Sequence, residues 1–104
     1  MKDTAAAISN IEKAISLDNE NAGFLMQRGK ICFQQREYNS AKNYFELALK
    51  KDPENLPLNE IYALNLNLLN DTIASKSWYE DIKKLKVKIG ARILFDTMLK
   101  EKLL

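Results

Sequence analysis

The stretch 22–55 constrains the fold of this chain most, because its apolar and small residues fall into two blocks with helical spacing. It reads AGFLMQRGKICFQQREYNSAKNYFELALKKDPEN, and residues 35–38 separate the blocks. The second block ends at Asp52-Pro53, since proline disfavours helical backbone in the residue before it and has no N–H to donate. The pattern predicts two helices of roughly three to four turns that form an antiparallel hairpin. The residues expected on the inner faces of this hairpin are Leu25, Gly29, Cys32, Ala41, Phe45 and Ala48.

The same stretch resembles the tetratricopeptide repeat, a helix–turn–helix unit of about 34 residues. Two positions depart from the signature of that family. Arg28 stands where a leucine precedes the glycine, and Cys32 stands where an aromatic residue follows it. The remaining places of the signature are filled, with the right spacing, by Leu25, Gly29, Ala41, Phe45 and Pro53.

The segment before this stretch has the pattern of half a repeat. Residues 4–17 predict one helix, and a shift of about 34 residues places Ala7, Ile11 and Ala14 on Ala41, Phe45 and Ala48. Residues 4–21 therefore resemble the second half of a repeat whose first helix is missing. A repeat unit cannot bury its apolar face alone. Two interpretations remain open: the chain is a piece of a longer array, or it starts with a single capping helix.

Residues 56–87 are interpreted as a degenerate second repeat. Residues 63–70 read ALNLNLLN, an alternation that suggests a strand. Asparagine is depleted in strands, however, and the register of the preceding repeat favours a helix. After a turn at 70–72, a second helix is expected over 73–85. It should carry Ser75, Tyr79 and Ile82 on its inner face, and Lys86-Val87 replaces the closing Asp-Pro.

Residues 88–104 predict a final amphipathic helix that caps the stack. Ala91, Leu94, Phe95 and Met98 share one face, whereas the opposite face is polar. The last helix of a solenoid needs one apolar and one polar face, because it meets water. The sequence thus predicts an all-α single domain over 1–104, a right-handed helical-hairpin solenoid. It would have about six helices: a lone N-terminal helix, two hairpins and a C-terminal capping helix.

Composition argues against catalysis. A chain of 104 residues makes one small domain. It has no histidine, which removes Ser-His-Asp and Cys-His arrangements and histidine-based metal sites. Cys32, the only cysteine, cannot form an internal disulfide and is expected to be a small buried hydrophobe. We therefore expect no enzymatic activity, no metal site and no cofactor.

Charge and hydropathy exclude further classes of protein. The net charge of +2 is too small to imply a nucleic-acid partner by itself. The lysine-rich run 83–88 is interpreted as a solvated helix end rather than a patch for an acidic partner. No apolar run approaches the roughly 18 residues of a transmembrane helix, and residues 1–10 lack the apolar core of a signal peptide. Membrane insertion is not expected, and the compartment stays open.

The resemblance implies a protein-interaction module or scaffold. Proteins of this family commonly bind a peptide or another protein on the concave surface of the superhelix, which is lined by the first helix of each hairpin. A mixture of apolar and polar side chains on that surface suits an amphipathic helix or an extended peptide. Alternatively, the C-terminal helix could pack on Leu64 and Leu68, two of the residues expected on that surface. Carried over by register, the expected peptide-binding residues are Met26, Lys30, Phe33, Gln34, Glu60, Leu64, Asn67 and Leu68.

Self-association is the alternative function. The N-terminal helix would leave Ile8, Ile11 and Ile15 uncovered, and this face could pair with a second copy of the chain.

Overall fold

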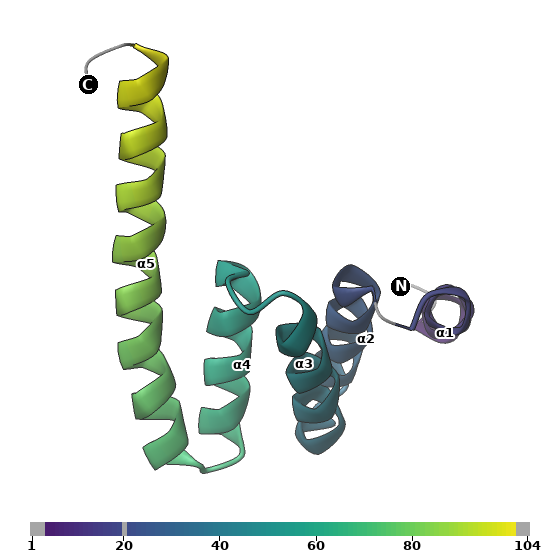
Figure 1. Cartoon of the computed structure of the whole chain (residues 1–104). Helices are drawn as coiled ribbons and strands as arrows, with labels where there is room; N and C mark the ends of the chain where they lie inside the picture. The colour runs from purple at the N-terminus through teal and green to yellow at the C-terminus, as the bar shows by residue number, and fades with distance from the viewer. Residues whose placement is uncertain (1–3, 20, 102–104) are drawn as a thin grey trace.

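The computed structural model describes residues 4–19 and 21–101, which form five α-helices and no strand. Each helix packs on the next one along the chain, so the molecule is a row of helices rather than a closed bundle (Figure 1). The all-α prediction is confirmed, including the helix at 56–68 that was chosen over a strand. The helices are α1 (Thr4–Leu17), α2 (Ala22–Gln34), α3 (Tyr38–Lys51), α4 (Leu56–Leu68) and α5 (Thr72–Lys100).

Local geometry recurs at one repeat length along the chain. Asn21 caps α2 by accepting a hydrogen bond from the Phe24 N–H at 3.1 Å, and Asn55 caps α4 by the same contact with Leu58. Both asparagines have extended backbone, as expected for N-cap residues. The turns inside the two hairpins each contain one residue in left-handed conformation, Arg36 and Asn70, both with φ of 63°. The second hairpin therefore repeats the first in its turns as well as in its helices.

The core follows the predicted inner faces of the hairpins. Phe45, Ala41 and Ala48 of α3 are completely buried, and Gly29 of α2 lies against the Phe45 ring. Cys32 is 1 % exposed, which confirms its interpretation as a buried hydrophobe, and burial raises the pKa of its thiol. In the second hairpin, the buried residues are Leu58, Asn59, Tyr62, Ala63, Asn65, Leu66, Ser75 and Ile82.

One inner position of the second hairpin was predicted wrongly. Tyr79 is 41 % exposed, and Trp78 packs against the core instead. Trp78 and Tyr79 are both three or four residues from Ser75 and Ile82, so helical spacing alone does not decide between them. Trp78 takes the inner place because its ring contacts Tyr62 and its Nε1 donates to Asn59 Oδ1.

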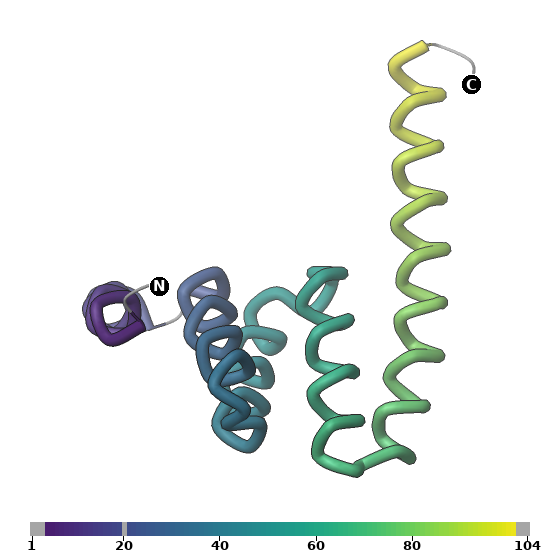
Figure 2. The backbone as a smooth tube through the Cα atoms, turned by 180° about the vertical axis from the view of Figure 1, so that it is seen from behind, coloured from purple at the N-terminus to yellow at the C-terminus, as the bar shows by residue number. Residues whose placement is uncertain are grey.

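Helix α5 corrects the prediction of a separate capping helix at 88–104. It runs for 29 residues without a break at Lys86-Val87, because lysine and leucine favour helix and no proline or capping glycine interrupts the run. At 1.5 Å per residue α5 is about 43 Å long and α4 only about 20 Å. The C-terminal part of α5 therefore projects alone beyond the other helices (Figures 1 and 2). It does not cover Leu64 and Leu68, which stay 42 % and 41 % exposed.

Arg28, one of the two departures from the family signature, joins three helices. Its Nε donates to Glu12 Oε1 of α1 at 2.7 Å, and its guanidinium carbon lies 5.3 Å from the ring centroid of Tyr44 in α3. Its Nη1 also donates to Cys32 Sγ at 3.2 Å. The guanidinium is largely enclosed, with 15 % of the side chain exposed, and such partly desolvated contacts are stronger than exposed ones. Arg28 thus holds α1 on the first hairpin.

Gly29→Ala is expected to destabilise the fold by about 1–3 kcal/mol, because overpacking a filled core strains its neighbours. A Cβ at this position would lie 2.6 Å from a ring carbon of Phe45, whose side chain has no free volume to move into. Gly90→Ala is the matched control, since a Cβ there meets nothing within 4 Å. It should stabilise its helix by about 0.5–1 kcal/mol. Urea denaturation measures both changes, and equal effects of the two substitutions would refute the close contact.

Candidate protein-binding groove

An open groove of about 690 Å³ lies between α3 and α5: α3 supplies five of its lining residues, and the loop before α4, α4 and α5 supply one each. Two leucines, a proline and two aromatic rings provide its apolar surface, and three polar side chains of α3 stand at its edge. Pockets of this kind, apolar with a few polar groups, are typical binding sites. The lining residues are Asn43, Glu46, Leu47, Leu49, Lys50, Pro53, Tyr62 and Trp78.

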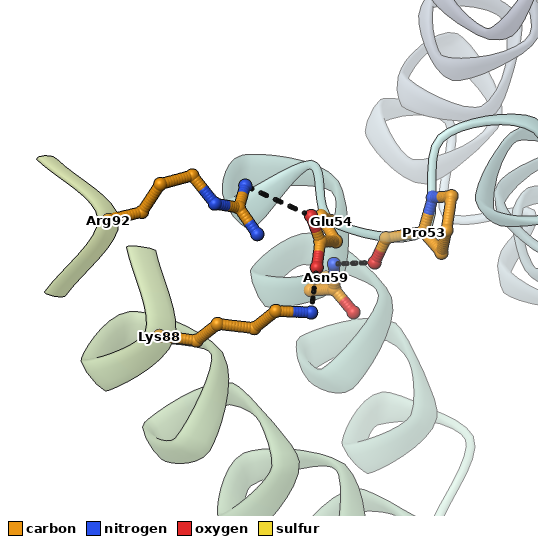
Figure 3. A network of polar contacts seen from close by, with 5 residues as sticks. All are labelled: Pro53, Glu54, Asn59, Lys88 and Arg92. Atoms are coloured by element: carbon orange, nitrogen blue, oxygen red, sulfur yellow. Dashed lines mark hydrogen bonds and ion pairs between the residues drawn. The ribbon is translucent and has the colours of Figure 1, made fainter. Parts of the chain in front are cut away.

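The aromatic wall of this groove is held rigidly. The rings of Tyr62 and Trp78 meet edge to face, with centroids 4.8 Å apart and planes inclined by 70°. Trp78 Nε1 donates to Asn59 Oδ1 at 3.1 Å, and Asn59 Nδ2 in turn donates to the carbonyls of Pro53 and Asn55 (the Pro53 contact is drawn in Figure 3). This chain of bonds connects α5, α4 and the loop before α4. The groove is consequently preformed rather than assembled on binding.

Tyr62 also fixes the α3 side of the groove. Its hydroxyl donates to Glu46 Oε2 at 2.6 Å, a short bond to a charged acceptor. Burial and the Glu46 carboxylate raise the pKa of Tyr62, so the hydroxyl stays protonated and keeps donating across the physiological range. Glu46 and Lys50 lie one turn apart on α3, which gives the rim both signs of charge.

An ion-pair cluster at Glu54 sets the position of α5. Glu54 lies in the loop between α3 and α4; Lys88 Nζ donates to its Oε2, and Arg92 Nη1 donates to its Oε1 at 3.3 Å (Figure 3). The hydrogen bond from Lys88, supported by that from Arg92, lowers the pKa of the Glu54 carboxyl. The cluster is solvent-exposed, so it orients the helix more than it stabilises the fold. It also gives Lys88, the last residue of the lysine-rich run 83–88, a structural partner.

The structure divides the residues expected to bind a peptide into two groups. Met26 and Phe33 pack partly against the core, and the Phe33 ring meets Tyr38 edge to face with centroids 5.6 Å apart. Lys30 is half-buried on the same helix, α2. The other members are exposed, Gln34 at the end of α2 and the rest on α4: Glu60, Leu64, Asn67 and Leu68.

The groove between α3 and α5 was not anticipated from the sequence. Leu47 falls outside the inner stripe of α3 and is 46 % exposed, and Trp78 is aligned with Tyr44 of the first repeat. These two side chains, off the predicted core face, are the only sequence signal that could have indicated it. The opening itself depends on how far α5 stands from α3, which no local pattern specifies.

The N-terminal isoleucines are less available than expected. Ile8, Ile11 and Ile15 are half-buried, and Ile15 packs against the core. Helix α2 therefore covers part of the face that was predicted to be open.

Residues 22–55 match the family described as the tetratricopeptide repeat, over the stretch where the signature was recognised. A comparison with curated proteins found no match to the chain. The stretch 22–55 is thus a tetratricopeptide repeat, and the row of helical hairpins fits a solenoid. Tetratricopeptide repeats are generally non-enzymatic modules for protein–protein interaction.

Two absences concern only the described part of the chain. No three histidine, cysteine or acidic side chains among residues 4–19 and 21–101 lie close enough to hold a metal ion. No helix within these ranges is long and apolar enough to cross a membrane.

Tyr62→Phe should lower the free energy of unfolding by about 1–2 kcal/mol, because it removes a hydrogen bond to a charged acceptor. Urea denaturation at neutral pH measures the change. Tyr79→Phe, at an exposed position of α5, serves as the control and should stay within about 0.5 kcal/mol of the parent chain. If the two variants were equally stable, the bond between Tyr62 and Glu46 would not hold the groove.

Lys88→Ala should raise the pKa of the Glu54 carboxyl towards its ordinary value. The folded-state pKa is lowered, so the cluster contributes above the unfolded-state pKa and is lost as the pH falls through the folded-state pKa. Titration of the glutamate side-chain carbons by NMR follows this group directly. Lys86→Ala is the control, since Lys86 is exposed and lies two residues before Lys88. If both variants left the pKa of Glu54 unchanged, the ion pair between Lys88 and Glu54 would be refuted.

Proposed function

We propose that this chain is a non-enzymatic interaction module that binds an apolar helical or extended segment of a partner protein in the groove between α3 and α5. The observation that supports this most is the rigid aromatic wall formed by Tyr62 and Trp78. A preformed surface lowers the entropy that binding must overcome. Buried aromatic anchors inside a polar rim are typical of the energetic centre of protein interfaces.

The dimensions and chemistry of the groove suggest the kind of ligand. Leu47 and Leu49 extend the apolar surface along α3 beyond the two rings, which favours a segment with several apolar side chains on one face. Lys50 and Glu46 at the rim can each pair with a charge beside that face. An amphipathic helix that docks through apolar side chains spaced three and four residues apart meets both requirements.

A second candidate binding face is the exposed part of the surface formed by α2 and α4, the first helix of each hairpin; we call it the first-helix face. Leu64 and Leu68 lie one turn apart on α4 and are exposed to nearly the same extent. With Glu60 and Asn67 beside them, they offer a smaller apolar patch with polar flanks. Met26 and Phe33 contribute less to this face, because the core already covers part of each side chain.

Self-association through the N-terminal helix is the alternative function. The half-buried Ile8 and Ile11 would carry it, since Ile15 is already packed against the core. The two functions can be told apart by experiment. Self-association through α1 makes the molecular mass depend on concentration and is lost on Ile8→Asp, whereas peptide binding in the groove requires no second copy.

A matched pair of leucine substitutions tests which face binds. Leu47 in the groove is 46 % exposed and Leu64 on α4 is 42 % exposed, so aspartate at either position perturbs the fold to a similar extent. A displayed library of random 20-residue peptides is selected on the parent chain, and affinities are measured by fluorescence anisotropy. We expect Leu47→Asp to weaken binding at least about tenfold and Leu64→Asp to change it less than about twofold.

The opposite ranking would transfer the site to the first-helix face, and equal losses would remove both assignments. Failure to select any peptide would contradict the proposed peptide-binding function itself. Thermal unfolding of both variants confirms that each remains folded.

A further inference from the structure

Helix α5 gains a second apolar side halfway along its length, in addition to the side that carries Ile82, Ile89 and Ile93. In its first half Ser75 and Ile82 are buried and face α4. From residue 87 onward, a second stripe of apolar side chains lies about half a turn away from Ile82, at 100° per residue, and thus faces away from the other helices. Three of its members are well exposed, Val87 by 73 %, Leu94 by 61 % and Phe95 by 54 %, whereas Met98 is half-buried. The outer stripe is defined as Val87, Ala91, Leu94, Phe95 and Met98.

The spacing of the outer stripe is that of a coiled-coil seam. Val87, Ala91, Leu94 and Met98 are separated by four, three and four residues, so they keep a 3.5-residue repeat on one side of the helix. The next seam positions on either side are occupied by charges of opposite sign, Lys84 and Glu101. A seam with a positive and a negative end is complementary to itself when two copies run in opposite directions.

We infer that a second copy of this chain covers the outer stripe, through antiparallel pairing of the projecting halves of α5. In the matching register Val87 faces Met98 of the other copy, and Ala91 faces Leu94. The same register places Lys84 opposite Glu101 at both ends of the seam. Parallel pairing would bring Lys84 against Lys84 and Glu101 against Glu101, which like-charge repulsion disfavours. This inference goes beyond the proposed function, since it uses neither the groove nor the first-helix face.

The shape of the chain permits this pairing. The outer stripe faces away from α4, and the C-terminal half of α5 stands clear of the remaining helices (Figure 2). The two bodies would therefore lie on the outer sides and at opposite ends of the paired helices. Such an arrangement has two-fold symmetry and closes at two copies. With a seam of only about three turns, the dimer should be weak, with a Kd on the order of 10–100 μM.

Sedimentation equilibrium of the full chain between about 1 μM and 1 mM tests the pairing. We expect a reversible monomer–dimer equilibrium for the parent chain and a monomer throughout for Leu94→Asp. Ile93→Asp is the matched control, because Ile93 is 60 % exposed on the same helix but lies outside the outer stripe. It should dimerise with a Kd within about threefold of the parent value. Far-UV circular dichroism verifies that both variants keep their helices.

Charge exchange tests the direction of pairing. Lys84→Glu and Glu101→Lys should each weaken the dimer about tenfold, because each places like charges together at both ends of the seam. The double variant Lys84→Glu/Glu101→Lys should recover the parent affinity. In a parallel dimer, neither single substitution would change the balance of charges, so unchanged single variants would overturn the inferred arrangement.

Three further outcomes would overturn the inference. The first is a parent chain that stays monomeric up to about 1 mM. The second is a dimer that Leu94→Asp and Ile93→Asp weaken equally, or that only Ile8→Asp disrupts. The third is growth into larger assemblies, which head-to-tail stacking of solenoids produces and a closed two-fold dimer does not.

Discussion

The close approach of α2 and α3 at Gly29 is the contact on which the rest of the structure depends. Because Gly29 has no side chain, the Phe45 ring can lie directly against the backbone of α2, where it is completely buried. That ring joins Leu25, Cys32 and Leu58 in one continuous core cluster. Each helix in a stack of hairpins is stabilised mainly by its neighbours. The first hairpin therefore provides the surface on which α1 packs from one side and α4 from the other.

Sequence reasoning succeeded where a local pattern determines the packing. The spacing of Gly29, Phe45 and Ala48 specified a hairpin, and the register shift to Ser75 and Ile82 specified a second one, with all five residues buried. Asn55, which could have been assigned to a simple turn, caps a helix as its equivalent Asn21 does. These features depend on contacts within about one repeat length.

Failures occurred where the outcome depends on distant segments. The break expected at Lys86-Val87 came from the register of the repeat, whereas α5 continues as one helix. Its projecting half is oriented by Lys88 and Arg92 against Glu54, more than 30 residues earlier in the chain. The groove was missed for the same reason: its lining residues come from α3, α4 and α5, and its aromatic wall is held by the bond between Trp78 and Asn59. The apolar residues of the predicted capping helix were recognised correctly as one face, but that face points away from the stack.

The chain thus has two proposed working surfaces, the groove for a partner segment and the outer stripe for a second copy. Hydrogen–deuterium exchange of the parent chain with and without a selected peptide tests the first and central claim most directly. We predict slower exchange on binding in two segments that are distant in sequence, 43–50 of α3 and 72–79 of α5, with α2 unchanged. Slower exchange confined to α2 and α4 would contradict the groove as the binding site.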